Sequence, residues 1–522
     1  MDVATWESPD PGEVRVLGSQ ADWDQLAKDY ELLLADYDSS GGMGPHMAPF
    51  KRCLEVAQEG GATSVVVETR YLDVDFRSEY SAYYSRGFRT PPASARRLHF
   101  FRAPLRREQL WDLPADHGYL GYVILRPVPL GPVGRTMLKP PPGMETAVRT
   151  CVEEAVTLFG QRLEIKAVPF MQQDAQLDRC AHAAAWVCHY SAHRRHEASR
   201  RPMAAFSVMA DASLGYGRPI PSEGLTVQQL LELLRLFDLP CLAYDVENLP
   251  SIAIGPGTPP DPTPKLDPAT GERLPAGRWD TRIVSICCRY LNSGIPILVG
   301  NQGSDAHAWV LCGYDRQPQA GDHDWIRFVR HDDQRGPYLW VTDVLNDVAP
   351  DGYAYAPWRY LVVPLPDKLW LAPEPAEATA VALLPQLAQA MLAAVPGAAA
   401  QLLLDRAASG DLRWRTYAST ANAFKGGLTG RVDPIVLREY RVARFPRYVW
   451  VVEAIDRTKR QTGAPDVVLG EAVFDGTSSG LRPQALALHV PGVLAIYGAD
   501  GAVRGPFICG DDAYPTGGSG PS

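Results

Sequence analysis

A glutamine-bearing loop runs into an alanine-rich stretch in Phe170-Met-Gln-Gln-Asp-Ala-Gln-Leu-Asp-Arg-Cys180-Ala-His-Ala-Ala-Ala-Trp186. The pattern predicts a helix that begins at Cys180 and ends near residue 196. The dipole and the free backbone N–H groups at a helix start stabilise a thiolate, the nucleophilic form of cysteine. Cys180 is therefore the candidate nucleophile. The ordinary alternative is a small cysteine buried in a core.

Two later segments supply the other groups that a thiol nucleophile needs. Asp305-Ala-His307-Ala-Trp-Val places a histidine at the start of an apolar strand, and Asp332 and Asp333 end the next one. An imidazole can accept the thiol proton, and a carboxylate can hold that imidazole in one tautomer. Because side chains alternate along a strand, we expect only one of Asp332 and Asp333 to face His307. Asp305 is a weaker orienting candidate, and an inert core histidine beside solvated carboxylates is the alternative.

A glutamine amide is the candidate for stabilising a negatively charged oxygen in the reaction. Gln173 lies seven residues before Cys180, Gln172 lies eight before it, and Gln176 also competes for the role. Together with the backbone N–H of Cys180, such an amide would contribute about 3 kcal/mol to lowering the barrier. The alternative for each of these three glutamines is that it is a polar loop residue with no catalytic role.

The composition limits the classes of function that the chain can have. Of its 522 residues 46% are hydrophobic, which is enough for several cores, and the net charge of −9 argues against nucleic acid as a partner. The sequence contains no run of about 18 apolar residues, so it predicts no membrane span. The acidic start resembles no signal peptide, and nine irregularly spaced cysteines are most simply reduced thiols. We therefore expect a cytoplasmic protein.

The order of the patterns predicts a multidomain α/β (α+β) protein. Residues 1–168 form an N-terminal α/β domain of unknown role, and residues 169–366 form the domain with the candidate site. Within that domain we expect helices at 180–196, 225–237 and 279–292 and a proline-rich surface insertion at 255–278. The remaining segments are a C-terminal α/β domain of unknown role and a disordered tail, at 370–512 and 513–522.

Four histidines share one face of the predicted Cys180 helix, namely His182, His189, His193 and His196. The same arithmetic puts Cys180 on the opposite face, and several arginines follow nearby. We interpret the stripe as a solvated basic surface, because no carboxylate or cysteine joins it at ligand spacing. The sequence also lacks a glycine-rich phosphate-binding loop. We therefore expect neither a metal nor a cofactor.

Residues 170–345 resemble the papain-like cysteine peptidases, most closely the group that processes bacteriocin leaders at a double glycine. The resemblance rests on Gln173 and the Cys180 helix, on Gly224-Leu-Thr226 before a leucine-rich helix, on Gly294-Ile-Pro296 before an apolar strand, on His307-Ala-Trp-Val-Leu-Cys-Gly-Tyr314, and on Asp332. Gln173 is one residue too far from Cys180, and Ala181 stands where that group often has glycine. The resemblance implies a nucleophile helix packed on an antiparallel sheet and the catalytic set Cys180, His307, Asp332 and Gln173.

The implied activity is hydrolysis of a peptide or isopeptide bond in a peptide or protein substrate. Two alternatives share these motifs. One is a transglutaminase-like acyltransferase, which differs only in the acceptor, and the other is an inactive papain-like binding module, which the two departures favour. The N- and C-terminal domains would then select the substrate or bind a protein partner or regulator. We expect no nucleic-acid or membrane partner.

Overall fold

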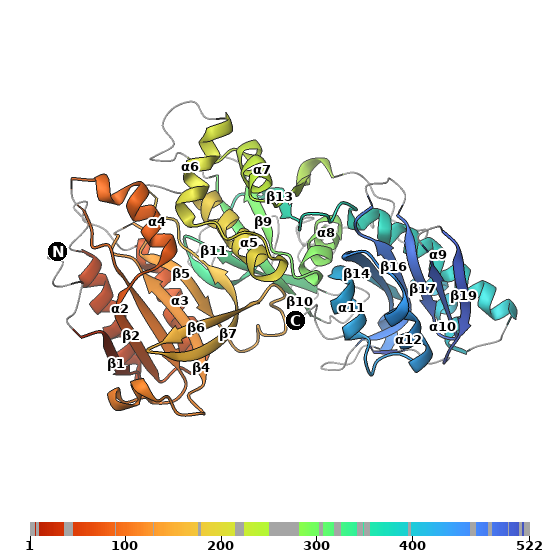
Figure 1. Cartoon of the computed structure of the whole chain (residues 1–522), viewed down its shortest axis with the longest axis horizontal. Helices are drawn as coiled ribbons and strands as arrows, with labels where there is room; N and C mark the ends of the chain where they lie inside the picture. Colours follow the sequence, from red (N-terminus) through yellow and green to blue (C-terminus); the bar gives the residue numbers. More distant parts are fainter. Residues whose placement is uncertain are drawn as a thin grey trace, which may run out of the picture. The chain divides into compact units, whose positions relative to one another are not determined.

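The structure is a computed structural model, and it describes residues 6, 10–35, 45–88, 90–128, 130–175, 179–214, 224–249, 281–301, 306–317, 325–341, 348, 355–394, 398–459, 466–478, 483–498, 501–510 and 514–515. The chain combines helices with antiparallel sheets and divides into two compact units (Figure 1). The first comprises residues 1–247 and 295–366, and the second comprises residues 248–294 and 367–522. The predicted insertion at 255–278 lies outside the described residues, as do Asp305 and Gln176.

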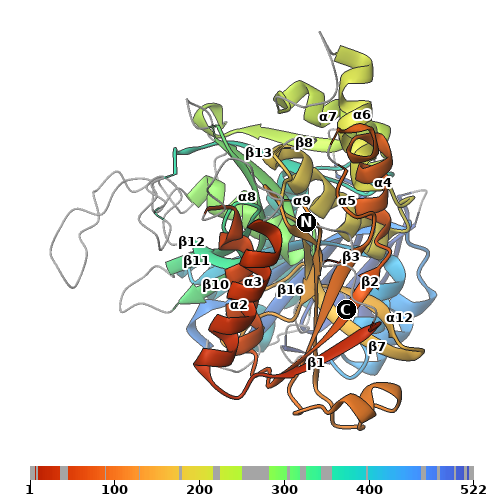
Figure 2. The same ribbon diagram turned by 90° about the vertical axis from the view of Figure 1, so that its left-hand side faces the viewer.

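The first unit contains a seven-stranded sheet in the order β1-β2-β3-β4-β5-β7-β6, and all neighbouring strands are antiparallel. Its strands are β1 (Gly12–Val16), β2 (Ser64–Tyr71), β3 (Ala95–Phe101), β4 (Tyr119–Leu125), β5 (Val133–Leu138), β6 (Val152–Leu158) and β7 (Gln161–Phe170). In Figure 2, α2 (Gln20–Ala35) and α3 (Ala48–Glu59) lie on one side of this sheet and α4 (Val74–Ala82) lies on the other. Buried side chains of α2 and α3 belong to one core, and those of α4 belong to another.

A second, six-stranded antiparallel sheet in the same unit has the order β12-β11-β10-β9-β13-β8. Its strands are β8 (Cys241–Asp245), β9 (Ile297–Asn301), β10 (Ala308–Gln317), β11 (Trp325–Asp332), β12 (Gly336–Val341) and β13 (Trp358–Pro364). The helices nearby in sequence are α5 (Cys180–His196), α6 (Met203–Leu214) and α7 (Val227–Leu236). The predicted helices at 180–196 and 225–237 are thus confirmed, whereas the sequence patterns missed α6.

Helix α5 packs on this second sheet through an apolar core. Small residues of the helix such as Ala184 and Ala185 share that core with Leu298 of β9 and Val310 of β10. The long buried side chain of Trp186 belongs to it as well. The alanines let the helix axis approach the strands closely, so the first residue of α5 lies beside the start of β10.

The N-terminal and central segments share a hydrophobic core. Phe50 and Cys53 of α3 belong to the same buried cluster as Cys312 and Val329 of the second sheet. A β-bridge joins Val148 to Gly313 as well. The predicted boundary near residue 168 therefore falls inside one compact unit, within strand β7.

The second unit is built on another antiparallel sheet, in the order β14-β15-β16-β17-β18-β19, with β20 paired to β16. Its strands are β14 (Leu412–Thr420), β15 (Tyr448–Asp456), β16 (Val467–Asp475), β17 (Ala485–Val490), β18 (Val493–Tyr497), β19 (Val503–Ile508) and β20 (Tyr514–Pro515). Its helices are α8 (Thr281–Asn292), α9 (Pro373–Ala394), α10 (Ala398–Ser409), α11 (Ala421–Gly427) and α12 (Pro434–Val442). The pairing of β20 corrects the prediction of disorder for these two residues of the tail, and α8 confirms the helix predicted at 279–292.

Candidate functional site

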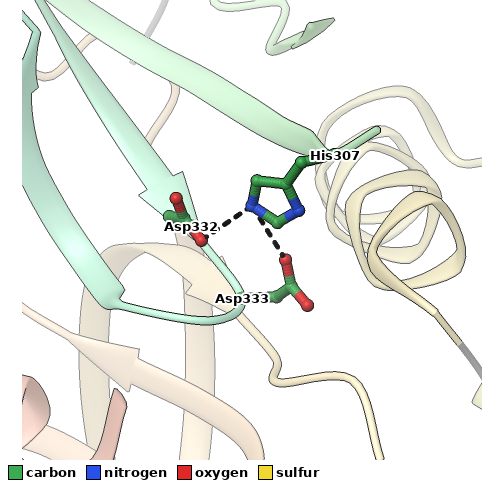
Figure 3. Close-up of side chains that lie close together, drawn as sticks. All are labelled: His307, Asp332 and Asp333. Atoms are coloured by element: carbon green, nitrogen blue, oxygen red, sulfur yellow. Dashed lines mark hydrogen bonds and ion pairs between the residues drawn. The ribbon is translucent and has the colours of Figure 1, made fainter. Parts of the chain in front are cut away.

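The candidate site lies where the start of β10 meets the end of β11 and the first residue of α5. The Nε2 atom of His307 is 3.0 Å from Oδ1 of Asp332 and 3.8 Å from Oδ1 of Asp333 (Figure 3). The side chain of Cys180 lies close enough to the imidazole to raise the pKa of His307. Three residues that are far apart in sequence thus come together: Cys180, His307 and Asp332.

Strand pairing and helix packing explain this meeting. Val310 of β10 pairs with His331 of β11 in the antiparallel register, so the residue before β10 lies near the last residue of β11. The main-chain N–H of His307 also donates to Oδ1 of Asn301 at 2.6 Å, which ties it to the end of β9. Cys180 is the first residue of α5 and is partly exposed, unlike the apolar residues that follow it.

Asp332 is a buried carboxylate with a full set of donors. Its Oδ1 accepts from His307 Nε2 and from the main-chain N–H of Gln334 at 3.0 Å, and its Oδ2 accepts from the Tyr355 hydroxyl. Burial alone would raise the pKa of Asp332. The charge and hydrogen bond of His307, the charge of Arg330 and the Tyr355 hydroxyl hold it below its usual value. Asp332 is therefore a fixed negative charge that orients the imidazole.

The imidazole of His307 is correspondingly basic. Burial would lower the pKa of His307, but the charge and hydrogen bond of Asp332, the Cys180 side chain and the charge of Asp333 together raise it well above its usual value. Its ring stacks on that of Tyr355 with centroids 6.2 Å apart. His307 can thus take a proton from a neighbouring thiol and keep it as an imidazolium.

The prediction that only one of Asp332 and Asp333 faces His307 is wrong. Strand β11 ends at Asp332, so Asp333 already belongs to the turn before β12 and escapes the alternation of a strand. Both carboxyl groups approach the same nitrogen of the ring (Figure 3). Burial, with a small contribution from the charge of Asp332, raises the pKa of Asp333 to about 7 against the attraction of His307. The carboxyl groups of Asp332 and Asp333 therefore differ in protonation near neutral pH.

The second ring nitrogen of His307 points away from both carboxyl groups (Figure 3). The Nε2 atom of Gln334 lies 3.4 Å from this Nδ1 atom. The sequence patterns did not single out Gln334 or Tyr355. One signal could have indicated Gln334, since an aspartate often accepts a hydrogen bond from the main-chain N–H two residues on.

The structure distinguishes Gln172 from Gln173. The buried Gln172 amide accepts from the main-chain N–H of Val133 at 3.0 Å and donates to the carbonyl of His46 at 2.8 Å. Arg126 donates to the Gln172 carbonyl at 2.7 Å. Gln172 therefore fixes the loop in place, whereas the neighbouring Gln173 is partly exposed. Of the two, Gln173 is the better candidate for an oxyanion donor.

The predicted solvated histidine face of α5 is wrong for His182 and His189, which are both 1% exposed. His182 Nδ1 accepts from the main-chain N–H of Arg179, so it caps the start of the helix. His189 packs edge-on against the rings of Phe206 and Phe237. The prediction of a helix at 180–196 is confirmed. Helices α6 and α7 cover the side of α5 on which His189 lies, a side that we expected to face solvent.

Among the described residues, one group of side chains has the spacing of metal ligands: His307, Asp332 and Asp333. Hydrogen bonding already accounts for two of them. The oxygens of Asp332 accept from three donors, and the His307 nitrogen that faces the carboxyl groups is 3.0 Å from one of them. A basic imidazole between two carboxyl groups is electrostatically satisfied without a cation. The donor set thus favours an ion pair over a metal site.

Comparisons of the chain with protein-family models, with curated proteins and with solved structures found no match. Within the described part of the chain, every helix is too short or too polar to cross a membrane. The site must therefore be interpreted from its own geometry.

Proposed function

We propose that this protein is a thiol-dependent amide hydrolase, most simply a papain-like cysteine peptidase, in which Cys180 is the nucleophile. One observation carries the proposal. The imidazole of His307 has the Cys180 side chain close enough to raise its pKa, and a buried aspartate, Asp332, lies 3.0 Å from its Nε2 atom. A thiol, an imidazole and a carboxylate in this order are the parts that nucleophilic acyl transfer requires.

The proposed reaction has two halves. His307 takes the thiol proton as the sulfur of Cys180 attacks an amide carbonyl carbon, and the tetrahedral oxyanion receives N–H donors from Gln173 and the Cys180 main chain. The C–N bond then breaks, the amine takes the proton from His307, and a thioester stays on Cys180. Water next gives a proton to His307 and attacks the thioester, which releases a carboxylic acid and the free thiol.

Transfer to an amine instead of water would make the chain an acyltransferase. An inactive binding module would keep the fold without the chemistry. The closeness of the Cys180 side chain to a basic imidazole favours catalysis over an inactive module. Hydrolysis is the simpler proposal, because it needs no amine acceptor as a second substrate. All nine cysteines are free thiols, which suits a reducing compartment such as the cytoplasm.

The test is the reactivity of Cys180 toward limiting iodoacetamide at pH 6, located by peptide mass spectrometry. Cys241 is the matched control, because it is also partly exposed while burial raises its pKa to about 12. We expect Cys180 to react at least about tenfold faster than Cys241, since only a thiolate attacks the reagent.

The variant His307→Ala should slow the reaction of Cys180 by about tenfold or more and leave Cys241 unchanged. A wild-type Cys180 that reacts no faster than Cys241 would contradict the proposal. So would a fast Cys180 in the His307→Ala variant, because the reactivity would then have another origin.

A further inference from the structure

A small cavity lies between α5 and the second sheet, beside the candidate site. It offers about 10 Å³ to the centre of a water molecule, which is close to the room that one water needs. Most of its wall is apolar, from Ala183 and Val187 of α5 and from Met171 and Trp309. Asp333 also lines this cavity, so a carboxyl group faces a nearly apolar space.

The surroundings of Asp333 are poor in hydrogen-bond donors. Its side chain is 5% exposed, and neither carboxyl oxygen has a well-formed hydrogen bond within the described residues, although the main-chain N–H of Gln173 lies close enough to favour the charged form. Its neighbour Asp332, in contrast, accepts from three donors. Two adjacent carboxyl groups thus lie near His307, but only that of Asp332 accepts well-formed hydrogen bonds from the described residues.

Few charges face Asp333 from the elements around it. His307 lies 3.8 Å away before β10, and Asp332 and His331 come from β11. Burial lowers the pKa of His331 to about 3, so it adds no positive charge. The cavity walls from α5 and from the loop after β7 are apolar, and the main chain of Gln173 lies near the Asp333 carboxyl group. Within the described part of the chain, the one positive partner of Asp333 is therefore His307, which Asp332 already neutralises.

We propose that Asp333 is a second positioning residue for His307, and that it carries a proton of its own in the resting site. This inference rests on the proposed function of Cys180 and His307. While Asp333 is neutral, the imidazolium has one counter-charge and can give its proton to the departing amine. When Asp333 loses its proton to the solvent, two carboxylates hold the imidazolium. It is then a weaker acid, and the site gains a negative charge.

The charge on Asp333 can be measured with two alkylating reagents of equal size class. Iodoacetate is an anion and iodoacetamide is neutral, so the ratio of their rates with Cys180 reports the charge near the thiol. In the wild type we expect this ratio to fall by about threefold or more between pH 6 and pH 8, because a buried charge acts over several ångströms. The variant Asp333→Asn, which has the shape of the protonated side chain, should show no such fall.

Asp315→Asn is the matched control, since Asp315 pairs with Arg327 on the same sheet and lies outside the site. It should retain the wild-type change. The proposal is overturned if Asp333→Asn gives the wild-type change in ratio. It is also overturned if both Asp333→Asn and Asp333→Ser fail to fold at pH 6, because a neutral side chain should replace a neutral carboxyl group. A wild-type Cys180 without raised reactivity would instead contradict the proposed function.

Discussion

At the scale of single residues, donors decide what each carboxyl group near His307 does. Asp332 has three donors and stays ionised, whereas Asp333 faces a small cavity and has a pKa raised to about 7 by burial. Such a separation of two neighbouring acids is common where one residue orients and another exchanges protons. The site thus combines one fixed charge with one that can change near neutral pH.

The orienting role of Asp332 predicts a large effect from a small change. In Asp332→Asn the imidazole loses its counter-charge, and an amide can favour the wrong tautomer. We expect the alkylation rate of Cys180 at pH 6 to fall by about tenfold or more. The measurement is the rate with iodoacetamide, and Asp315→Asn should stay at the wild-type rate. An unchanged rate in Asp332→Asn would rule out this role for Asp332.

The sequence indicated part of this site and could not indicate the rest. The sequence indicates three of the residues because each lies at the end of a predicted helix or strand, where catalytic residues are often found: Cys180, His307 and Asp332. The approach of Asp333 depends on where β11 ends, which the alternation pattern does not specify to one residue. Tyr355 lies beyond the strands that carried the motifs, and no spacing relates it to Asp332.

At the scale of elements, the loop between β7 and α5 contains two adjacent glutamines, Gln172 and Gln173, that have different roles. The amide of Gln172 satisfies the buried main-chain N–H of Val133 and the partly buried carbonyl of His46. Gln173, in the same loop before α5, is partly exposed. Sequence could not separate the two, because the difference lies in contacts with residues about 40 and 125 positions away.

This difference predicts opposite outcomes for two neighbouring substitutions. Gln172→Ala should lower the free energy of unfolding by about 1–3 kcal/mol, because two buried or partly buried main-chain groups lose their partners. Gln173→Ala should leave that free energy within about 0.5 kcal/mol of the wild type. In any amide-hydrolysis assay, however, it should reduce turnover by about 100-fold or more. Chemical denaturation and turnover are the measurements, and each variant is the control for the other.

The reverse pattern would contradict this assignment. If Gln172→Ala were stable and lost turnover while Gln173→Ala were fully active, Gln172 would be the oxyanion donor. The loop would then have to change its conformation to release the Gln172 amide from Val133 and His46.

At the scale of the whole molecule, the N-terminal segment and the second sheet fold as one unit. The chain passes so closely at Gly313 that a Cβ atom there would lie 2.2 Å from the carbonyl oxygen of Ala147. The main-chain N–H of Tyr314 donates to that same oxygen at 2.9 Å. The sequence showed two successive α/β patterns and placed a boundary between them, because local periodicity does not reveal which cores are shared.

This close approach predicts a sharp difference between two glycines of the same sheet. Gly313→Ala should lower the free energy of unfolding by about 1–3 kcal/mol, because the added methyl group forces the two segments apart. Gly300→Ala should have little effect, since nothing lies within 4 Å of the Cβ position at Gly300. Urea denaturation measures both. Equal stability of the two variants would show that the contact at Gly313 contributes nothing to holding the unit together.

In the second unit, Glu453 and Glu471 lie opposite each other on β15 and β16, and both are fully buried. Burial first, and then the charge of Glu453, raises the pKa of Glu471 to about 7. An unfolded glutamate has a pKa of about 4.3. Between these values the folded chain holds the extra proton, so the free energy of unfolding falls as the pH rises from about 4 to about 7.

The substitution Glu471→Gln removes this dependence. The carbonyl of the new amide side chain can still accept from the Tyr440 hydroxyl, which in the wild type donates to Glu471 at 2.8 Å. Relative to the wild type, the variant should gain stability over that pH range, by at most about 4 kcal/mol, and the gain should be constant above about pH 7. Thermal unfolding between pH 4 and pH 8 measures it. A variant that loses stability relative to the wild type as the pH rises would contradict the protonated state of Glu471.

If one thiol, one imidazole and one carboxylate act together in the proposed site, the ionisation of His307 must depend on both of its partners. An NMR titration of ¹⁵N-labelled histidine, assigned with the His307→Ala variant, gives the pKa of His307. The contacts with Cys180, Asp332 and Asp333 predict a pKa well above the ordinary value in the wild type and a lower pKa in Cys180→Ala. An ordinary pKa for His307 that is the same in both proteins would contradict the account.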